Sequence, residues 1–142
     1  MTSRAPEDSP FLALSRRLFG LERRYGMALV RFDDRQWECT MLFRRGDREV
    51  QFIFEARGAF SIPFVQIRPP NPSERFSLYE LLPALGEPHP DFGTSLSAEE
   101  LETLMGVYAD FFHAHADELL GDHGPLWAAV QRYRDRQRSS GA

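Results

Sequence analysis

The spacing of apolar residues changes at Gly26, and this change determines the class of fold that the chain can adopt. Before Gly26, apolar residues recur every three or four positions, as on the buried face of an amphipathic helix. After it, apolar and polar residues alternate, which is typical of a strand with one covered face. We therefore predict a helix over residues 9–25, opened by Ser9-Pro10, and then a run of strands.

Four segments are predicted to form strands, over residues 26–32, 36–44, 48–56 and 59–69. The short polar turns between them indicate an antiparallel meander. One face of this sheet is expected to be apolar, with Trp37, Cys39, Met41, Phe43, Val50, Phe52 and Phe54 pointing to it. Pro63 cannot donate a backbone hydrogen bond, so the last strand is expected to lie at an edge or to carry a bulge.

The rest of the chain favours helices. Ser77 to Glu80 is a possible capping box for a short helix, and Ser97 to Glu100 is a cleaner one that opens a long helix ending at Leu120. A last helix is predicted from Gly124-Pro125.

The fold class is therefore α+β: an N-terminal helix, a four-stranded antiparallel meander, and two to three C-terminal helices packed on one sheet face. Residues 1–142 are expected to form one domain, with residues 1–8 and 137–142 frayed.

Charge is distributed unevenly along the chain. The formal net charge is −4, but residues 69–123 hold eleven acidic residues and a single Arg. This acidic block argues against nucleic-acid binding, because neutralisation of phosphates supplies that affinity. It is compatible with a basic protein partner.

The sequence also bears on location and cofactors. No apolar stretch approaches the ~20 residues of a membrane helix, and the first residues do not resemble a secretory signal. The single cysteine, Cys39, is expected to be a buried thiol rather than a nucleophile. We therefore expect a cytoplasmic protein that does not contact a membrane. No motif for a cofactor, a metal or catalysis was identified, so no catalytic residue and no cofactor is assigned.

Three histidines and four acidic residues crowd into residues 108–124. On a regular helix His113 and His115 are separated by about 200°, so they cannot share a metal ion. His115 is predicted to face the core and His113 to face solvent, in a row with Asp110 and Asp117. This row has too few ligands for a metal site and is better explained as a solvated surface or as a surface that meets a partner.

We therefore predict that any partner is bound by the polar face of the helix over residues 97–120. The residues assigned to this role are Glu99, Glu102, Asp110, His113 and Asp117. Concentrated negative charge on one helix face would steer a basic partner and increase the rate of association.

The layout of the chain resembles a known group of proteins. The segments FLALSRRLFGLERRYGM and FSLYELLPALG, the strands between them and the later HADELLGD are similar to small uncharacterised α+β proteins of GC-rich bacteria. Some of those proteins resemble immunity proteins of polymorphic toxin systems. The resemblance implies a non-enzymatic protein-binding module, an immunity-type inhibitor that occludes its partner. The alternatives are a secretion-chaperone-like homodimer and, with less support, a small metal-dependent enzyme.

Overall fold

The computed structural model describes residues 4–68, 75–121 and 125–140. It confirms the α+β class, with six strands in place of the four predicted. The helices are η1 (Pro6–Asp8), α1 (Pro10–Phe19), α2 (Leu21–Tyr25), α3 (Leu78–Ala84), α4 (Ala98–Leu119) and α5 (Pro125–Ser140). The strands are β1 (Ala28–Asp34), β2 (Glu38–Arg45), β3 (Arg48–Arg57), β4 (Ala59–Phe60), β5 (Phe64–Ile67) and β6 (Phe76–Ser77).

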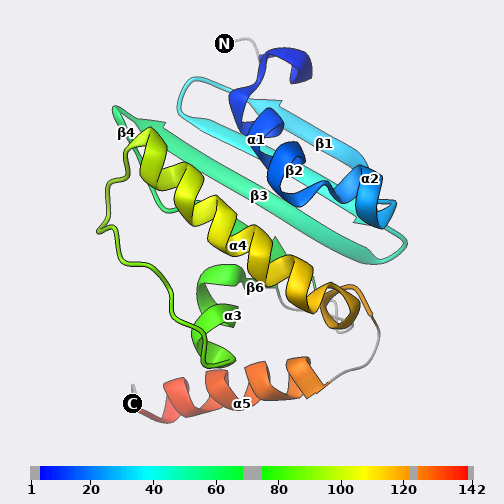
Figure 1. Cartoon of the computed structure of the whole chain (residues 1–142), viewed down its shortest axis with the longest axis vertical. Helices are drawn as coiled ribbons and strands as arrows, with labels where there is room; N and C mark the ends of the chain where they lie inside the picture. Colours follow the sequence, from blue (N-terminus) through cyan, green and yellow to red (C-terminus); the bar gives the residue numbers. More distant parts are fainter. Residues whose placement is uncertain (1–3, 69–74, 122–124, 141–142) are drawn as a thin grey trace.

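The strands form one antiparallel sheet in the order β1-β2-β3-β5-β6, and β4 pairs with the end of β3 (Figure 1). The predicted fourth strand is split in two around Pro63, because residues 61–63 stand opposite only two residues of β3. The strand is thus interrupted at this proline, for which an edge position or a bulge was predicted; β5 is not at an edge, because it pairs with both β3 and β6. The additional strand, β6, lies near the start of the acidic block of residues 69–123 and pairs with β5.

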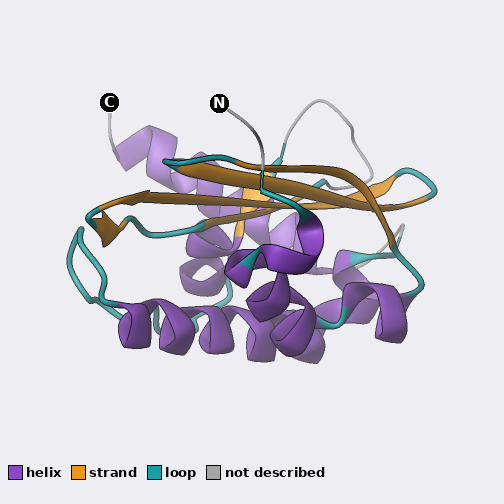
Figure 2. Ribbon diagram, turned by 90° about the horizontal axis from the view of Figure 1, so that it is seen from above, coloured by secondary structure: helices purple, strands orange, loops and turns teal. Residues whose placement is uncertain are grey.

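One face of the sheet is covered by helices. Figure 2 shows α1 and α4 beneath the sheet, with no described helix over its opposite face at β1–β3. Helix α5 packs against α3 and α4, beyond the β6 side of the sheet (Figure 1). The covered face is the one predicted to be apolar, and it meets α1 through the rings of Phe19 and Phe52, 5.0 Å apart. Both rings are fully buried.

The predicted buried residues of β2 and β3 lie in this core, with one exception. Cys39, Met41 and Phe43 are buried, but Trp37 is 48% exposed. Trp37 precedes the first residue of β2, so the sheet's alternation does not direct its ring to the core; instead it lies near the guanidinium of Arg57, whose Cζ is 5.8 Å from the ring centroid.

The N-terminal helix was predicted as one element and is in fact two. Gly20 adopts a left-handed conformation, with φ of 58°, and its N–H donates to the carbonyl of Arg16 at the end of α1. A side chain at Gly20 would be strained at this φ, so the glycine is the physical reason for the break. The break redirects α2 and brings Tyr25 beside α4.

Regular elements occupy part of both terminal ranges that were predicted to fray, residues 1–8 and 137–142. Pro6–Asp8 form η1, and the backbone N–H of Arg4 donates to the carbonyl of Asp34 at 2.6 Å. At the other end, α5 extends to Ser140. Residues 1–3, 141 and 142 lie outside the described residues.

Candidate functional site

The five predicted partner-binding residues all lie on α4. A capping box defines the start of this helix, since Ser97 accepts from the N–H of Glu100 and the Glu100 carboxylate accepts from the N–H of Ser97. Four of the five are exposed, namely Glu99, Glu102, Asp110 and Asp117. Glu102 pairs with Arg17 of α1. The other three exposed acids form no ion pair with any described residue.

His113 does not face solvent with these acids, so its predicted orientation is wrong. Its Nδ1 lies 2.6 Å from the hydroxyl of Tyr25, and its Nε2 lies 2.9 Å from the carbonyl oxygen of Leu18. Its ring stacks on that of Tyr25. His113 is half-buried and is a contact between α4 and the α1–α2 corner rather than part of a free surface.

Both ring nitrogens of His113 make polar contacts. With its Nε2–H donating to the carbonyl of Leu18, its Nδ1 accepts from the Tyr25 hydroxyl. The guanidinium of Arg24 lies 3.2 Å from the same Nε2. Both ring nitrogens are therefore used in joining α4 to the N-terminal helices.

The other two histidines that the structure describes, His89 and His115, also take part in packing. His115 is half-buried, and its ring centroid is 4.6 Å from that of Phe111. His89, on the loop before α4, bridges the carbonyl of Pro90 and the hydroxyl of Tyr108. Burial lowers the pKa of His89 and raises that of Tyr108.

His123, with Asp122, lies outside the described residues. Within residues 4–68, 75–121 and 125–140, no three His, Cys, Asp or Glu side chains are grouped closely enough to hold a metal ion.

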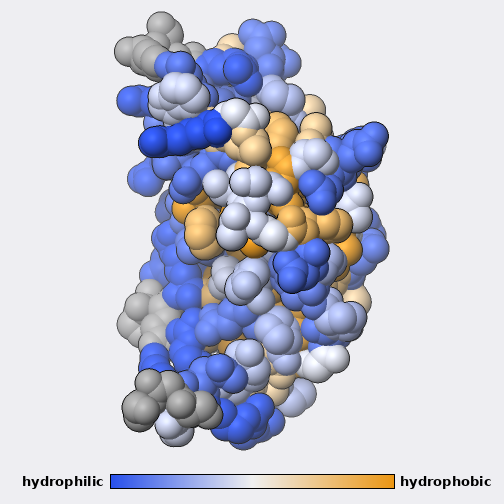
Figure 3. Space-filling model, turned by 90° about the vertical axis from the view of Figure 1, so that its left-hand side faces the viewer, coloured by the Kyte–Doolittle hydropathy of each residue, from blue (hydrophilic) through white to orange (hydrophobic). Residues whose placement is uncertain are grey.

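A cleft of about 600 Å³ opens between α1, the first turn of α4 and the ends of β1 and β3. The apolar part of its lining includes Phe11, Leu14, Phe60 and Leu101. The cleft forms here because Phe60 and Leu96 exchange two backbone hydrogen bonds, of 3.1 and 2.8 Å, which hold the start of α4 against β4. Figure 3 views this side of the molecule, where apolar surface is gathered in the upper half.

Charged side chains border the cleft. Glu102, one of the five predicted residues, lines it together with its partner Arg17. Asp34 also lines it and is only 2% exposed, with a carboxylate oxygen 3.5 Å from the guanidinium of Arg4. The cleft thus combines an apolar floor with charged groups at its margin, which is the usual composition of a binding site.

Cys39 of β2 is paired with Asp34 of β1, which lines the cleft. Burial raises the pKa of its thiol to about 12, and the negative charge of Asp34 acts in the same direction. The thiolate, which is the nucleophilic form, is therefore disfavoured. The prediction of a buried thiol is confirmed.

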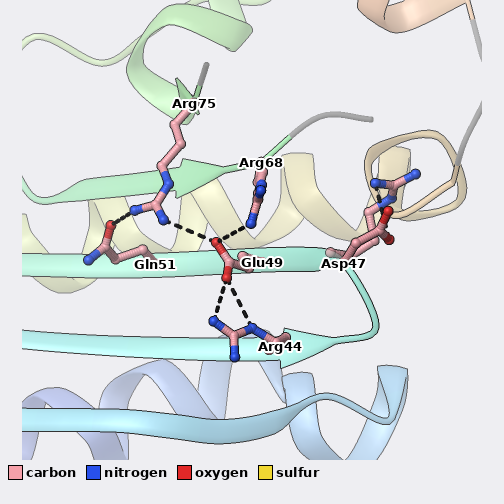
Figure 4. A network of polar contacts seen from close by, with 7 residues as sticks. Arg44, Asp47, Glu49, Gln51, Arg68 and Arg75 are labelled. Carbon is pink, nitrogen blue, oxygen red and sulfur yellow. Dashed lines mark hydrogen bonds and ion pairs between the residues drawn. The ribbon is translucent and has the colours of Figure 1, made fainter. Parts of the chain in front are cut away.

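A second group of polar residues lies on the opposite, helix-free face of the sheet, and the sequence did not reveal it (Figure 4). The carboxylate of Glu49, 3% exposed, accepts from Arg44 and Arg75 and lies 3.4 Å from Arg68. We call these four residues the Glu49 cluster. Burial alone would raise the pKa of Glu49, but the hydrogen bond from Arg44 and the charges of Arg75, Arg44 and Arg68 outweigh it, so the pKa is lowered.

Comparison with known proteins gave no significant match: no family model, no curated protein and no solved structure matches the chain. No helix among the described residues is long and apolar enough to cross a membrane. The candidate sites therefore depend on the geometry alone.

His113→Phe is expected to lower the free energy of unfolding by about 1–3 kcal/mol, because it keeps an aromatic ring but removes two hydrogen bonds. Urea denaturation measures this. His115→Phe is the matched control, since His115 is equally half-buried but makes no hydrogen bond to a described residue. Equal losses in the two variants would show that the hydrogen bonds of His113 do not join the helices.

Glu49→Gln is expected to destabilise the protein by at least about 1 kcal/mol at neutral pH, where the carboxylate is ionised. Because the pKa is lower in the folded chain, this contribution is fully present above the ordinary value of 4.5 and is lost as the pH falls through the folded pKa. Denaturation curves at pH 7 and pH 3 should show a smaller difference between wild type and variant at pH 3. Glu55→Gln, at an exposed position of the same strand, should show no such change.

Proposed function

We propose that this chain is a non-enzymatic protein-binding module, and that it binds its partner through the cleft between α1 and α4 and the acidic residues beside it. In this proposal it acts as an immunity-type inhibitor, covering the functional site of the partner. The observation that carries the proposal is a cleft of about 600 Å³ with a largely apolar lining, which the first turn of α4 borders, together with exposed acidic residues farther along the same helix.

The cleft supplies the apolar part of such an interface. Large side chains of a partner would pack against Phe11, Leu14 and Leu101, and contacts of this kind supply most of the affinity of protein interfaces. The cleft walls belong to α1, α4 and β4, which are anchored in the core. A rigid cleft loses little conformational entropy when it is filled.

The exposed acids supply the electrostatic part. Glu99, Asp110 and Asp117 are exposed and form no ion pair with a described residue, so their charges are available to a partner. Their position on one helix favours a basic partner, which they would attract over several ångströms before contact. Glu102 lies where the acidic face meets the cleft.

The size of the cleft also favours a second candidate function, the binding of a small apolar molecule. Clefts of about 300–1,000 Å³ are typical of small-molecule sites. Under this alternative the purified protein would bind a hydrophobic dye with a defined stoichiometry, and the acidic residues of α4 would not affect that binding.

Filling the cleft is the direct test of the proposal. Ala13 and Ala98 are exposed small residues on its margin, so Ala13→Trp and Ala98→Trp would block it without altering the core. Once a partner is identified by co-purification, each variant should weaken its binding at least about tenfold, measured by calorimetry. Ala128→Trp, at an exposed position of α5, is the control and should bind as wild type. Unchanged affinity in both cleft variants would exclude the cleft as the contact surface.

Reversing charge on α4 tests the acidic face separately. Asp110→Arg with Asp117→Arg should slow association with a basic partner by about tenfold at low salt, and the difference should shrink as salt is added. Stopped-flow measurements give this rate. Asp135→Arg, on the exposed surface of α5, is the matched control. An association rate that these two reversals leave unchanged would remove the acidic face from the interface.

A further inference from the structure

The Glu49 cluster contains more positive charge than its carboxylate requires. Three guanidiniums surround one carboxylate: Arg44 donates through Nε and Nη2 at 3.0 and 2.7 Å, Arg75 donates through Nη2 at 3.0 Å, and Arg68 Nη1 lies at 3.4 Å. These four contacts fill the acceptor positions of the two carboxylate oxygens. Counting one charge per side chain, the cluster carries a net charge of +2.

The donors left over face solvent. A guanidinium has five N–H donors, and among the described residues Arg44 and Arg75 use two each and Arg68 one. The three side chains are 46%, 41% and 31% exposed, in the order Arg44, Arg75 and Arg68. A buried carboxylate thus holds three partly exposed guanidiniums together, each with unused donors.

The sheet brings these residues together. Arg44 and Glu49 are directly paired on β2 and β3, and the backbone N–H of Arg68, just after β5, donates to the carbonyl of Glu49 at 3.1 Å. Arg75, just before β6, is held by Gln51, whose side-chain oxygen accepts at 2.5 Å. Figure 4 shows the guanidiniums converging on Glu49 from neighbouring strands. Their positions are therefore preorganised, which is what separates a binding site from dispersed surface arginines.

The surroundings add no compensating negative charge from described residues. Asp47, at the β2–β3 turn, pairs with Arg48. Along the strands, the neighbours on the same face are neutral: Gln51 is paired with Gln66, and Gln66 with Ser77.

We propose that the Glu49 cluster is a binding site for a doubly charged oxyanion of the phosphate class. A dianion matches the net charge of +2, whereas a single carboxylate would leave one charge uncompensated. The planar guanidinium offers parallel N–H donors that bind two oxygens of a phosphate at once. Glu49 orients the arginines from below without competing for the anion, because it is buried.

The test uses the full chain, labelled with ¹⁵N, and follows the side-chain Nε–H signals of arginine during titration with phosphoserine and with inorganic phosphate, at constant ionic strength. Saturable shifts are expected at Arg44, Arg68 and Arg75. Arg68→Gln with Arg75→Gln should weaken binding at least about tenfold. Arg132→Gln, at an exposed position on α5, should leave it unchanged.

Two further measurements keep the result decisive. Arg68→Lys with Arg75→Lys preserves the charge but removes the paired donors, so it should also weaken binding. At pH 5 phosphoserine is mostly a monoanion, since its second pKa is about 6, and its affinity should fall several-fold.

Shifts that do not saturate, or that are the same in wild type and in both double variants, would overturn the proposal. If the site binds, tighter binding of phosphoserine than of inorganic phosphate favours a phosphoprotein as the source of the anion, and equal binding favours a small free anion.

Discussion

The packing of α1 and α4 on one face of the sheet is the constraint on which the rest of the structure depends. Phe19 of α1 lies 5.0 Å from Phe52 of β3 and 5.6 Å from Phe112 of α4, measured between ring centroids, so it contacts both layers of the core. These rings are buried, and removal of their apolar surface from water is a main source of stability. The cleft lies at the margin of this layer, where α1 and the first turn of α4 meet the ends of β1 and β3.

The two faces of the sheet consequently differ in chemistry. The covered face joins helices through apolar contacts and through the His113 hydrogen bonds, and it presents the cleft at its margin. On the helix-free face, the buried carboxylate of Glu49 holds three arginines in place. The four side chains together carry a positive net charge. An acidic helix face and a basic cluster therefore lie on opposite sides of the sheet.

Much of the fold could be predicted from local patterns, since each depends on residues close together in the chain. The alternation of Val50, Phe52 and Phe54 identified the buried face of β3, and Ser97 with Glu100 located the start of α4. The exposed acids of α4 were also placed correctly by helical periodicity. His113 was misplaced because periodicity assigns a side chain to a face of its own helix, and Tyr25 reaches that face only after the break at Gly20.

The sequence by itself determined the element types, the buried face of the sheet and the acidic character of α4, because periodicity, capping and charge are properties of short segments. Only the tertiary structure decided where the cleft and the Glu49 cluster form. The cleft brings together α1, β4 and α4, and the Glu49 cluster joins β2 and β3 to residues after β5 and before β6. Sites of this kind depend on how distant segments pack, and no local pattern contains that information.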